Sequence, residues 1–332
     1  MSAPHITPKG PKAGSWRLES RSPEFPLRPE RKAQCVPALE PGDEFKRNRG
    51  KTLGISVITG ASSGIGAAAA LQLTRSGERV LITGRSPEKL RSVHGALLAA
   101  APDGTTVPEP IAADLSSLAG VRDLAQQILD RLPRVDVLVN NAAVQPSKRH
   151  VSADGFELGL AVNHLAPFLL TNLLAASIQA ASGRVITTAS SSHVKGSLDL
   201  ADPQLTRGWS GVQSYGRSKL ANILFTAELQ RRTPLPASCF HPGAIRTDIN
   251  RDSPFVRFVK PFERFVLKPP EQGADTLAWL ATSAEGGAPS AVYYADRAPA
   301  DSSPAARDAG LAAHLWDLSM DLTGADPWPR TA

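Results

Sequence analysis

From Leu53 onward, short apolar runs alternate with longer stretches of helical periodicity along nearly the whole sequence. Short apolar runs that are bounded by glycine, proline or small polar residues are typical of buried strands. The stretches between them repeat apolar residues with the spacing of helices that bury one face. Strands and helices in alternation predict βαβ units, which form a parallel sheet covered by helices on both faces.

The predicted elements make one α/β domain over residues 51–325. Ser86 and Pro87 favour a helix start, because serine caps the first turn and proline suits the first helical position. Strands are expected at residues 55–59, 80–83, 108–112, 135–139, 184–188, 237–241 and 291–294. Helices are expected at residues 66–75, 88–100, 118–130, 156–176, 215–231 and 272–283. The sequence therefore predicts a doubly wound, mostly parallel seven-stranded sheet.

Two cysteines, Cys35 and Cys239, stand in a chain of 332 residues. They provide neither a disulfide framework nor the spacing of a metal site, so we expect a reducing compartment and no bound metal. No stretch approaches the roughly 20 apolar residues of a membrane-spanning helix, and the N-terminus has no apolar signal core. These features predict a cytoplasmic protein.

Residues 1–50 contain eight prolines and ten Lys or Arg against six Asp or Glu. This composition predicts a disordered, basic extension, which could serve as a targeting arm or a partner-binding tail, or have no function. Residues 326–332 are expected to form a short tail. No basic stripe with interleaved aromatic residues occurs in the central region, so nucleic-acid binding is not expected.

A glycine-rich turn follows the first predicted strand and opens into an alanine-rich helix. Its sequence is Thr59-Gly60-Ala61-Ser62-Ser63-Gly64-Ile65-Gly66. Glycines permit a tight turn and close approach to a pyrophosphate, and the helix N-terminus offers unpaired N–H groups to the phosphates. The placement of this turn between strand and helix predicts a Rossmann-type dinucleotide site.

The spacing of this turn resembles that of classical short-chain dehydrogenases/reductases. The resemblance implies cofactor contacts from Gly60, Ser62, Ser63, Gly64, Ile65 and Gly66. Other segments resemble further cofactor motifs of the family, and imply contacts from Asp114 and Leu115, from Asn141, and from Pro242, Gly243 and Thr247. Ala143 stands where the family's Asn-Asn-Ala-Gly motif has its glycine.

The end of the second predicted strand bears on the choice of cofactor. No acidic residue occupies positions 83–86, where one would bind the ribose 2′-hydroxyl of NAD. Arg85 is present instead and could meet a 2′-phosphate, although it could also be a solvated residue before a helix. We therefore expect NADP(H) rather than NAD(H).

The segment from Tyr215 to Lys219 carries the predicted chemistry. Residues four apart on a helix share a face, and a lysine ammonium is expected to lower a tyrosine pKa from about 10. Ser190, just past the fifth strand, is expected to hold the substrate oxygen, with Ser191 and Ser192 as neighbouring alternatives. The resemblance adds Asn163, whose backbone carbonyl holds a water that leads to the lysine; a buried, satisfied amide is the alternative for this residue. Tyr215 and Lys219 should also contact the cofactor.

The sequence around Tyr215, together with residues 293–294 and 315–319, resembles the branch of retinol dehydrogenases and WW-domain oxidoreductases. This resemblance implies a lipophilic alcohol, aldehyde or ketone as the substrate. Together with Arg85 it leads us to expect an NADP(H)-dependent oxidoreductase that interconverts an alcohol and a carbonyl, with Tyr215 as general acid and base. A catalytically silent nucleotide-binding protein is the alternative.

Two further expectations concern surfaces. Phe255, Phe258, Phe262 and Phe265 repeat with near-helical spacing among basic residues, which suits a lid, ordinary packing or contact with a membrane surface. By analogy with relatives, a homodimer or homotetramer would pair through the helices that begin near Phe156 and Tyr215.

Overall fold

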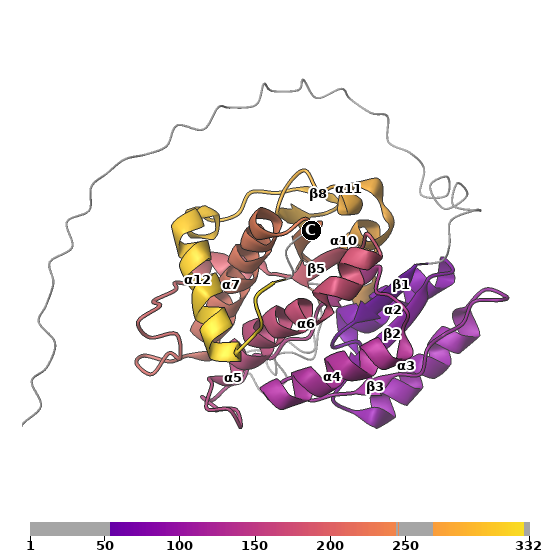
Figure 1. The fold of residues 1–332 in the computed structure, drawn as a ribbon, viewed down its shortest axis with the longest axis horizontal. Coiled ribbons are helices and arrows are strands. Elements are labelled where there is room, and N and C mark those ends of the chain that lie inside the picture. The colour runs from indigo at the N-terminus through magenta and orange to yellow at the C-terminus, as the bar shows by residue number, and fades with distance from the viewer. Residues whose placement is uncertain (1–53, 244, 246–267, 329–332) are drawn as a thin grey trace, which may run out of the picture. The chain divides into compact units, whose positions relative to one another are not determined.

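The computed structural model describes residues 54–243, 245 and 268–328. The extension over residues 1–50, the phenylalanine segment and Thr247 lie outside the described residues. Figure 1 shows the described chain as alternating strands and helices.

One eight-stranded sheet with the order β3-β2-β1-β4-β5-β6-β7-β8 forms the centre of the domain. The first seven strands run parallel, and β8 pairs antiparallel with β7. Their bounds are β1 Ile55–Ile58, β2 Arg79–Gly84, β3 Ile111–Ala112, β4 Val137–Asn140, β5 Arg184–Thr188, β6 Ala237–His241, β7 Tyr293–Ala295 and β8 Ala298–Pro299. The strand order reverses between β1 and β4, and in doubly wound sheets ligands bind at the carboxyl ends beside such a switch point.

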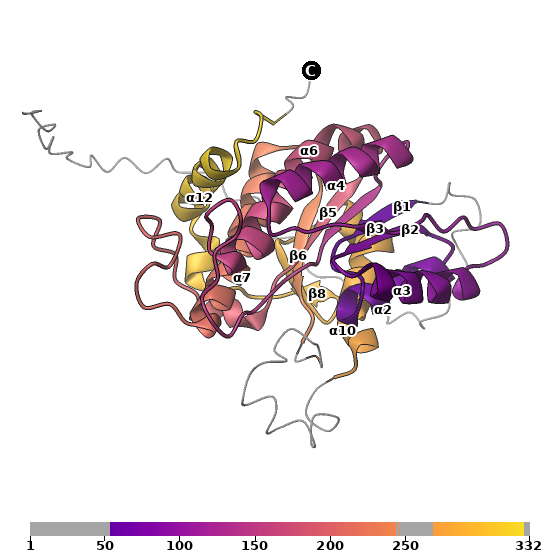
Figure 2. The same ribbon diagram turned by 90° about the horizontal axis from the view of Figure 1, so that it is seen from below.

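Helices cover both faces of the sheet, as Figure 2 shows. One face carries α2, α3 and α10, which bury their apolar residues against the strands. The other carries α4, α6 and α7. The bounds are α2 Gly64–Arg75, α3 Pro87–Ala100, α4 Leu118–Arg131, α5 Leu158–Leu160, α6 Ala166–Ala180, α7 Gly211–Arg232, α10 Pro270–Thr282, α11 Ala284–Gly287 and α12 Ala309–Thr323. The predicted doubly wound fold is confirmed.

Local sequence signals explain several helix starts. The Ser86 hydroxyl accepts a hydrogen bond from the Lys89 amide, with Pro87 at the first helical position, as predicted. Ser117 caps α4 in the same way through the Gly120 amide. Such caps satisfy N–H groups that have no partner within the helix.

Three elements differ from the sequence-based predictions. The edge strand β8 adds an eighth strand, and β3 is shorter than residues 108–112. Helix α12 was not predicted; it packs on α7, where Trp316 stacks on Phe225. Trp328 lies 5.1 Å from Trp316 between ring centroids, so the packed domain includes residues assigned to the tail.

Contrary to the expectation that no stretch approaches the length of a membrane-spanning helix, the helical stretch Leu158–Ala180 is long and apolar enough by composition alone. In the structure, 89% of its apolar window is buried. Phe168, Leu169 and Leu174 pack into the core beneath α4 and α7. This burial accounts for the apolar sequence as the core helix of a sheet-based domain.

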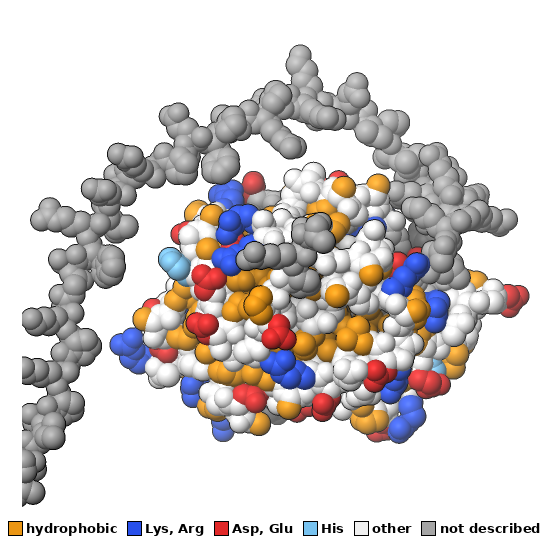
Figure 3. All heavy atoms as spheres, in the orientation of Figure 1, with side chains coloured by type: hydrophobic (Ala, Val, Ile, Leu, Met, Phe, Trp, Pro, Cys, Tyr) orange, Lys and Arg blue, Asp and Glu red, His pale blue; other side chains and the backbone are white. Residues whose placement is uncertain are grey.

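Basic and acidic side chains are interspersed on the face shown in Figure 3, with apolar atoms between them. This face therefore carries no broad field of a single sign among its described residues.

Candidate active site

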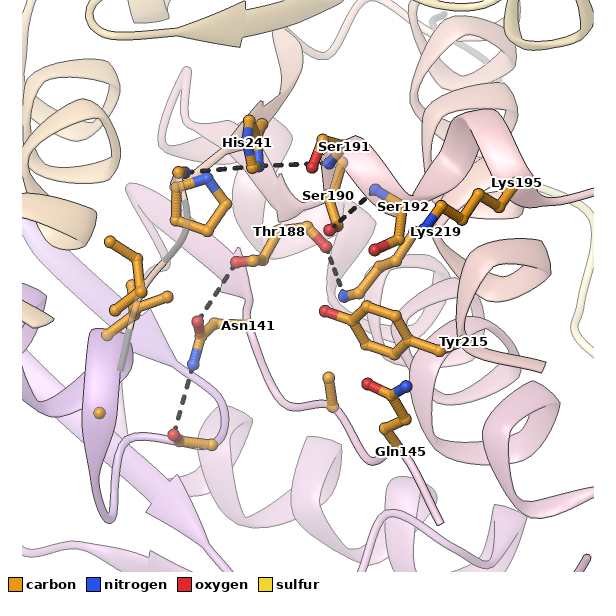
Figure 4. Close-up of a pocket in the computed structure, with 18 of the residues that line it drawn as sticks. Asn141, Gln145, Thr188, Ser190, Ser191, Ser192, Lys195, Tyr215, Lys219 and His241 are labelled. Atoms are coloured by element: carbon orange, nitrogen blue, oxygen red, sulfur yellow. Dashed lines mark hydrogen bonds between the residues drawn. The ribbon is translucent and has the colours of Figure 1, made fainter. Parts of the chain in front are cut away.

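A cavity of about 460 Å³ lies at the carboxyl ends of the central strands. Figure 4 shows that its lining side chains come from segments far apart in the sequence. One side is lined by the glycine turn through Gly60, Ser63, Gly64 and Ile65, and by Asn141. The other side is lined by Ser190, Tyr215 and Lys219. The cavity thus joins the predicted cofactor turn to the predicted catalytic residues.

Backbone geometry makes glycine necessary in the turn. Gly60 and Gly64 have φ values of 65° and 59°, a region that L-residues rarely adopt. A Cβ at Gly60 would lie 2.6 Å from Ala142 Cα. A Cβ at Gly66 would lie 2.6 Å from Asn141 Nδ2 and 2.8 Å from the Gly60 carbonyl oxygen. The glycines therefore let the turn, the helix and the loop after β4 approach closely.

The N-terminus of α2 opens toward this cavity. Ser63 occupies the cap position, but its side chain makes no capping hydrogen bond. The first turn of α2 contains no acidic residue. A helix N-terminus with uncapped N–H groups suits an anionic group, so these residues fit the pyrophosphate of a dinucleotide.

Hydrogen bonds fasten the turn to the loop after β4. The Thr59 hydroxyl accepts from the amides of Asn141 and Ala142 at 3.0 and 3.1 Å. Asn141 Nδ2 donates to the carbonyl oxygens of Thr59 and Gly60 at 3.0 and 3.3 Å. Thr188 donates to Asn141 Oδ1 at 3.3 Å, which links β5 to the same cluster. Asn141 therefore shapes the predicted cofactor site, and Thr59 is a structural partner that the sequence reasoning did not select.

The other predicted cofactor residues occupy the ends of β2 and β3. Arg85 is exposed just after β2, whose terminal Gly84 packs beside Ser62 of the turn. Asp114 accepts from the Ser116 amide at 2.9 Å and is exposed, whereas the Leu115 side chain belongs to the core. None of these side chains lines the cavity at Tyr215.

Helix α7 presents Tyr215 and Lys219 to the cavity. Lys219 is buried, and its ammonium group donates to the Thr188 carbonyl oxygen at 2.7 Å. Lys219 Nζ lies 5.5 Å from the centroid of the Tyr215 ring. Ser190 lies beyond the end of β5, and it lines the same cavity as Tyr215. The structure brings the three predicted residues into one cavity (Figure 4).

Burial dominates the ionisation of this pair. It raises the pKa of Tyr215 to about 12, opposed by the hydrogen bond from Ser190. It lowers the pKa of Lys219 to about 7, because the ammonium is removed from water. The pKa of Tyr215 in the protein therefore moves opposite to the direction expected from a neighbouring ammonium.

Asn163 lies in a π-helical turn, Ala161–Leu165, between α5 and α6. Its side chain is fully buried: Oδ1 accepts from the Val144 amide at 2.7 Å, and Nδ2 donates to the Val144 carbonyl and the Ser218 hydroxyl. The Asn163 amide thus joins the loop after β4 to α7 and does not line the cavity. The carbonyl role that the resemblance implies remains a prediction, although π turns occur often at functional sites.

A buried histidine supports the serine loop. His193 Nε2 accepts from the Ser303 amide at 3.0 Å, which leaves Nδ1 to donate to the Ser190 carbonyl at 2.8 Å. His241 Nδ1 accepts from the amides of Ser191 and Gly243. Sequence reasoning missed both positioning roles, since the partners are distant along the chain. Pro242 and Gly243 also line the cavity, and their contact with a cofactor stays a prediction.

Comparison with known proteins identifies the family of the chain. The family model for short chain dehydrogenases matches residues 55–254. The chain is 42% identical, over 81% of its length and 92% of the relative, to DnrU of Streptomyces sp. (strain C5), which carries the name of a daunorubicin C-13 ketoreductase. The chain belongs to the short-chain dehydrogenase family.

The relatives also define the branch. Human retinol dehydrogenase 14 is 36% identical over 87% of the chain and 91% of the relative. A metagenomic short-chain oxidoreductase solved in complex with NADP is 30% identical, with a TM-score of 0.51 over 70% of this chain and 92% of that one. The chain is an oxidoreductase of the retinol dehydrogenase-like branch, and the predicted resemblance is confirmed.

Proposed function

We propose that the protein is an NADP(H)-dependent oxidoreductase that interconverts an alcohol and a carbonyl, with Tyr215 as general acid and base. The convergence of Tyr215, Ser190 and Lys219 on one cavity with the glycine turn carries this proposal. The test is NADPH oxidation across aldehydes and ketones of increasing chain length. Turnover of at least one carbonyl supports it, and cofactor binding without turnover of any carbonyl favours a catalytically silent protein.

The bound nicotinamide would supply the hydride, and the chain's own residues would handle the oxygen of the substrate. Ser190 is placed to donate a hydrogen bond to that oxygen and to orient it toward Tyr215. The Tyr215 hydroxyl gives its proton to the developing alkoxide during reduction and takes it back during oxidation. Lys219, held by the Thr188 carbonyl, provides positive charge beside the phenol when it is protonated. Polar groups that the fold holds in place need little rearrangement during the reaction.

Arg85 should decide between the two dinucleotides. We expect Arg85→Ala to weaken NADPH binding by at least about tenfold and NADH binding by much less, because an arginine–phosphate contact is charge-assisted. Titration of both cofactors by fluorescence checks this. Arg131→Ala removes an equal charge from the exposed end of α4 and should leave both affinities unchanged. Equal losses for NADPH and NADH in Arg85→Ala would show that Arg85 does not read the 2′-phosphate.

Lys219 should destabilise the fold at neutral pH. Its pKa falls from 10.5 to about 7 on burial, so between these values the unfolded chain binds more protons. The free-energy cost of burying the charged Lys219 side chain is full below pH 7, and it shrinks as the pH rises toward 10.5. We expect Lys219→Met to raise the free energy of unfolding by on the order of 2–4 kcal/mol at pH 6.5, and by less at pH 8.5.

Urea unfolding of the cofactor-free protein at both pH values tests this expectation, while turnover by Lys219→Met should be lost. A stability difference that is independent of pH would contradict the lowered pKa of Lys219.

The remaining expectations concern the surroundings of the enzyme. Assembly as a homodimer or homotetramer and a cytoplasmic location stay predictions. Helix α12 packs on α7, so pairing through α7 would also involve α12. A lipophilic substrate also stays a prediction. Polar side chains among the residues that line the cavity, such as Gln145 and Lys195, favour a substrate with polar groups as well.

A further inference from the structure

A lysine outside the catalytic set lines the cavity beside Tyr215. Lys195 ends the 3-10 helix η2, Ser191–Lys195, which follows the catalytic serine. It forms no ion pair with any acidic residue in the described part of the chain. Neither the proposed proton transfer nor the cofactor turn uses this charge.

The backbone of η2 is fixed against the catalytic helix. A Cβ at Gly196 would lie 2.4 Å from the Gly216 carbonyl oxygen, and one at Gly216 would lie 2.9 Å from that of Ser192. Two glycines thus let the end of η2 touch α7 immediately after Tyr215. The backbone at Lys195 is therefore held beside the first turns of α7, unlike that of a lysine on a free loop.

Hydrogen bonds from α7 also hold the segment that follows η2. The Arg217 guanidinium donates to the Ser197 carbonyl at 2.8 Å and to the Asp202 carbonyl at 2.6 Å. Arg217 is itself buried on α7. The loop is thereby tied to the catalytic helix on both sides of Gly196.

The cavity has a mixed lining, in which polar side chains accompany Lys195. Gln145 and Ser192 line it together with Lys195, and Val212 is the apolar side chain that α7 adds there. A purely hydrocarbon substrate would gain little from these groups and would displace their water. A substrate that carries an oxygen anion would instead form a charge-assisted hydrogen bond with the ammonium.

We infer that Lys195 selects carbonyl substrates that carry a carboxylate or similar oxygen anion away from the reacting carbonyl. This inference rests on the proposed function and names the substrate class of the same cavity. A lysine at the end of a helix is often merely solvated, and a pair exposed to water contributes little. Lys195 is exposed to solvent, so the inference rests on its fixed backbone and on the cavity that it lines together with Tyr215.

The test compares charged substrates with neutral substrates that carry the same aldehyde on the same ring. We would measure kcat/KM with NADPH for 2-, 3- and 4-formylbenzoate and for their methyl esters. The wild-type enzyme should prefer the acid over its ester for at least one isomer. Lys195→Gln should reduce that preference by about tenfold, and Lys195→Glu should reduce it further. Added salt should weaken the preference in the wild-type enzyme.

Lys148→Gln is the matched control, because Lys148 is exposed and does not line the cavity. Lys148→Gln should keep the higher kcat/KM for the acids over their esters. This result would exclude a general effect of the protein's net charge. Thermal unfolding and NADPH affinity would show that each Lys195 variant is folded. Equal kcat/KM for every acid and ester, or a preference that survives in Lys195→Gln, would overturn the inference while the proposed function stands. Failure to turn over these compounds and every neutral carbonyl would instead overturn the proposed function, and the inference with it.

Discussion

Replacing Tyr215 by phenylalanine should lower kcat by at least about 100-fold, while the Kd for NADPH changes by no more than about twofold. The substitution removes one hydroxyl from a ring that lines the cavity and leaves the packing of that ring in place. Without the hydroxyl, the proton donor and acceptor of the proposed mechanism is missing. Steady-state kinetics and cofactor titration separate the two quantities.

Tyr294→Phe is the matched control for this substitution. Tyr294 is buried on the face of the sheet opposite to α7, which carries Tyr215. Its hydroxyl donates to Glu285 at 2.5 Å. Its loss should reduce stability by about 1–2 kcal/mol and leave turnover intact. Unchanged kcat in Tyr215→Phe would end the proposed role of Tyr215.

Alanine at Gly66 should abolish cofactor binding and destabilise the domain by about 1–3 kcal/mol, the usual cost of overpacking. The added Cβ would overlap the Asn141 amide and the Gly60 carbonyl oxygen, and that oxygen belongs to the backbone of the turn. Since Asn141 holds the turn through its own hydrogen bonds, moving it would distort the site as well as the packing. Chemical unfolding and NADPH titration measure the two effects.

Gly95→Ala tests the same substitution where space is open. Gly95 lies within α3, and no atom stands within 4 Å of the position that an added methyl group would take. Alanine should stabilise that helix by up to about 1 kcal/mol, because glycine is the poorer helix former. If Gly66→Ala were as stable as Gly95→Ala and bound NADPH normally, the cofactor site would not depend on the close packing at Gly66.

Periodicity in the sequence was sufficient for the central architecture. The strands from β1 to β6 and the helices between them follow from local apolar patterns, because each buries a regular face. Helix α12 escaped prediction although Asp308 caps it and Gly324 ends it in a left-handed conformation. The π turn around Asn163 was also not predicted, and the Asn163 side chain bonds to Val144 and Ser218, which are distant along the chain.

The candidate site divides in the same way. The glycine turn and the pair formed by Tyr215 and Lys219 are contiguous motifs, so their spacing alone indicates chemistry. Thr59, His193 and Lys195 acquire their roles from partners that the fold brings together. The ionisation of Tyr215 and Lys219 likewise depends on burial, which the four-residue spacing does not reveal.

The most direct measurement follows the hydride and the proton donor together. NADPH carrying deuterium at the transferred position of C4 would be mixed with an aldehyde that the enzyme reduces, and the alcohol would be analysed by mass spectrometry. The wild-type enzyme should place the cofactor's deuterium on the carbinol carbon, and Tyr215→Phe should form almost none of this product. Alcohol that lacks the label, or labelled alcohol formed equally fast by Tyr215→Phe, would contradict hydride transfer assisted by Tyr215.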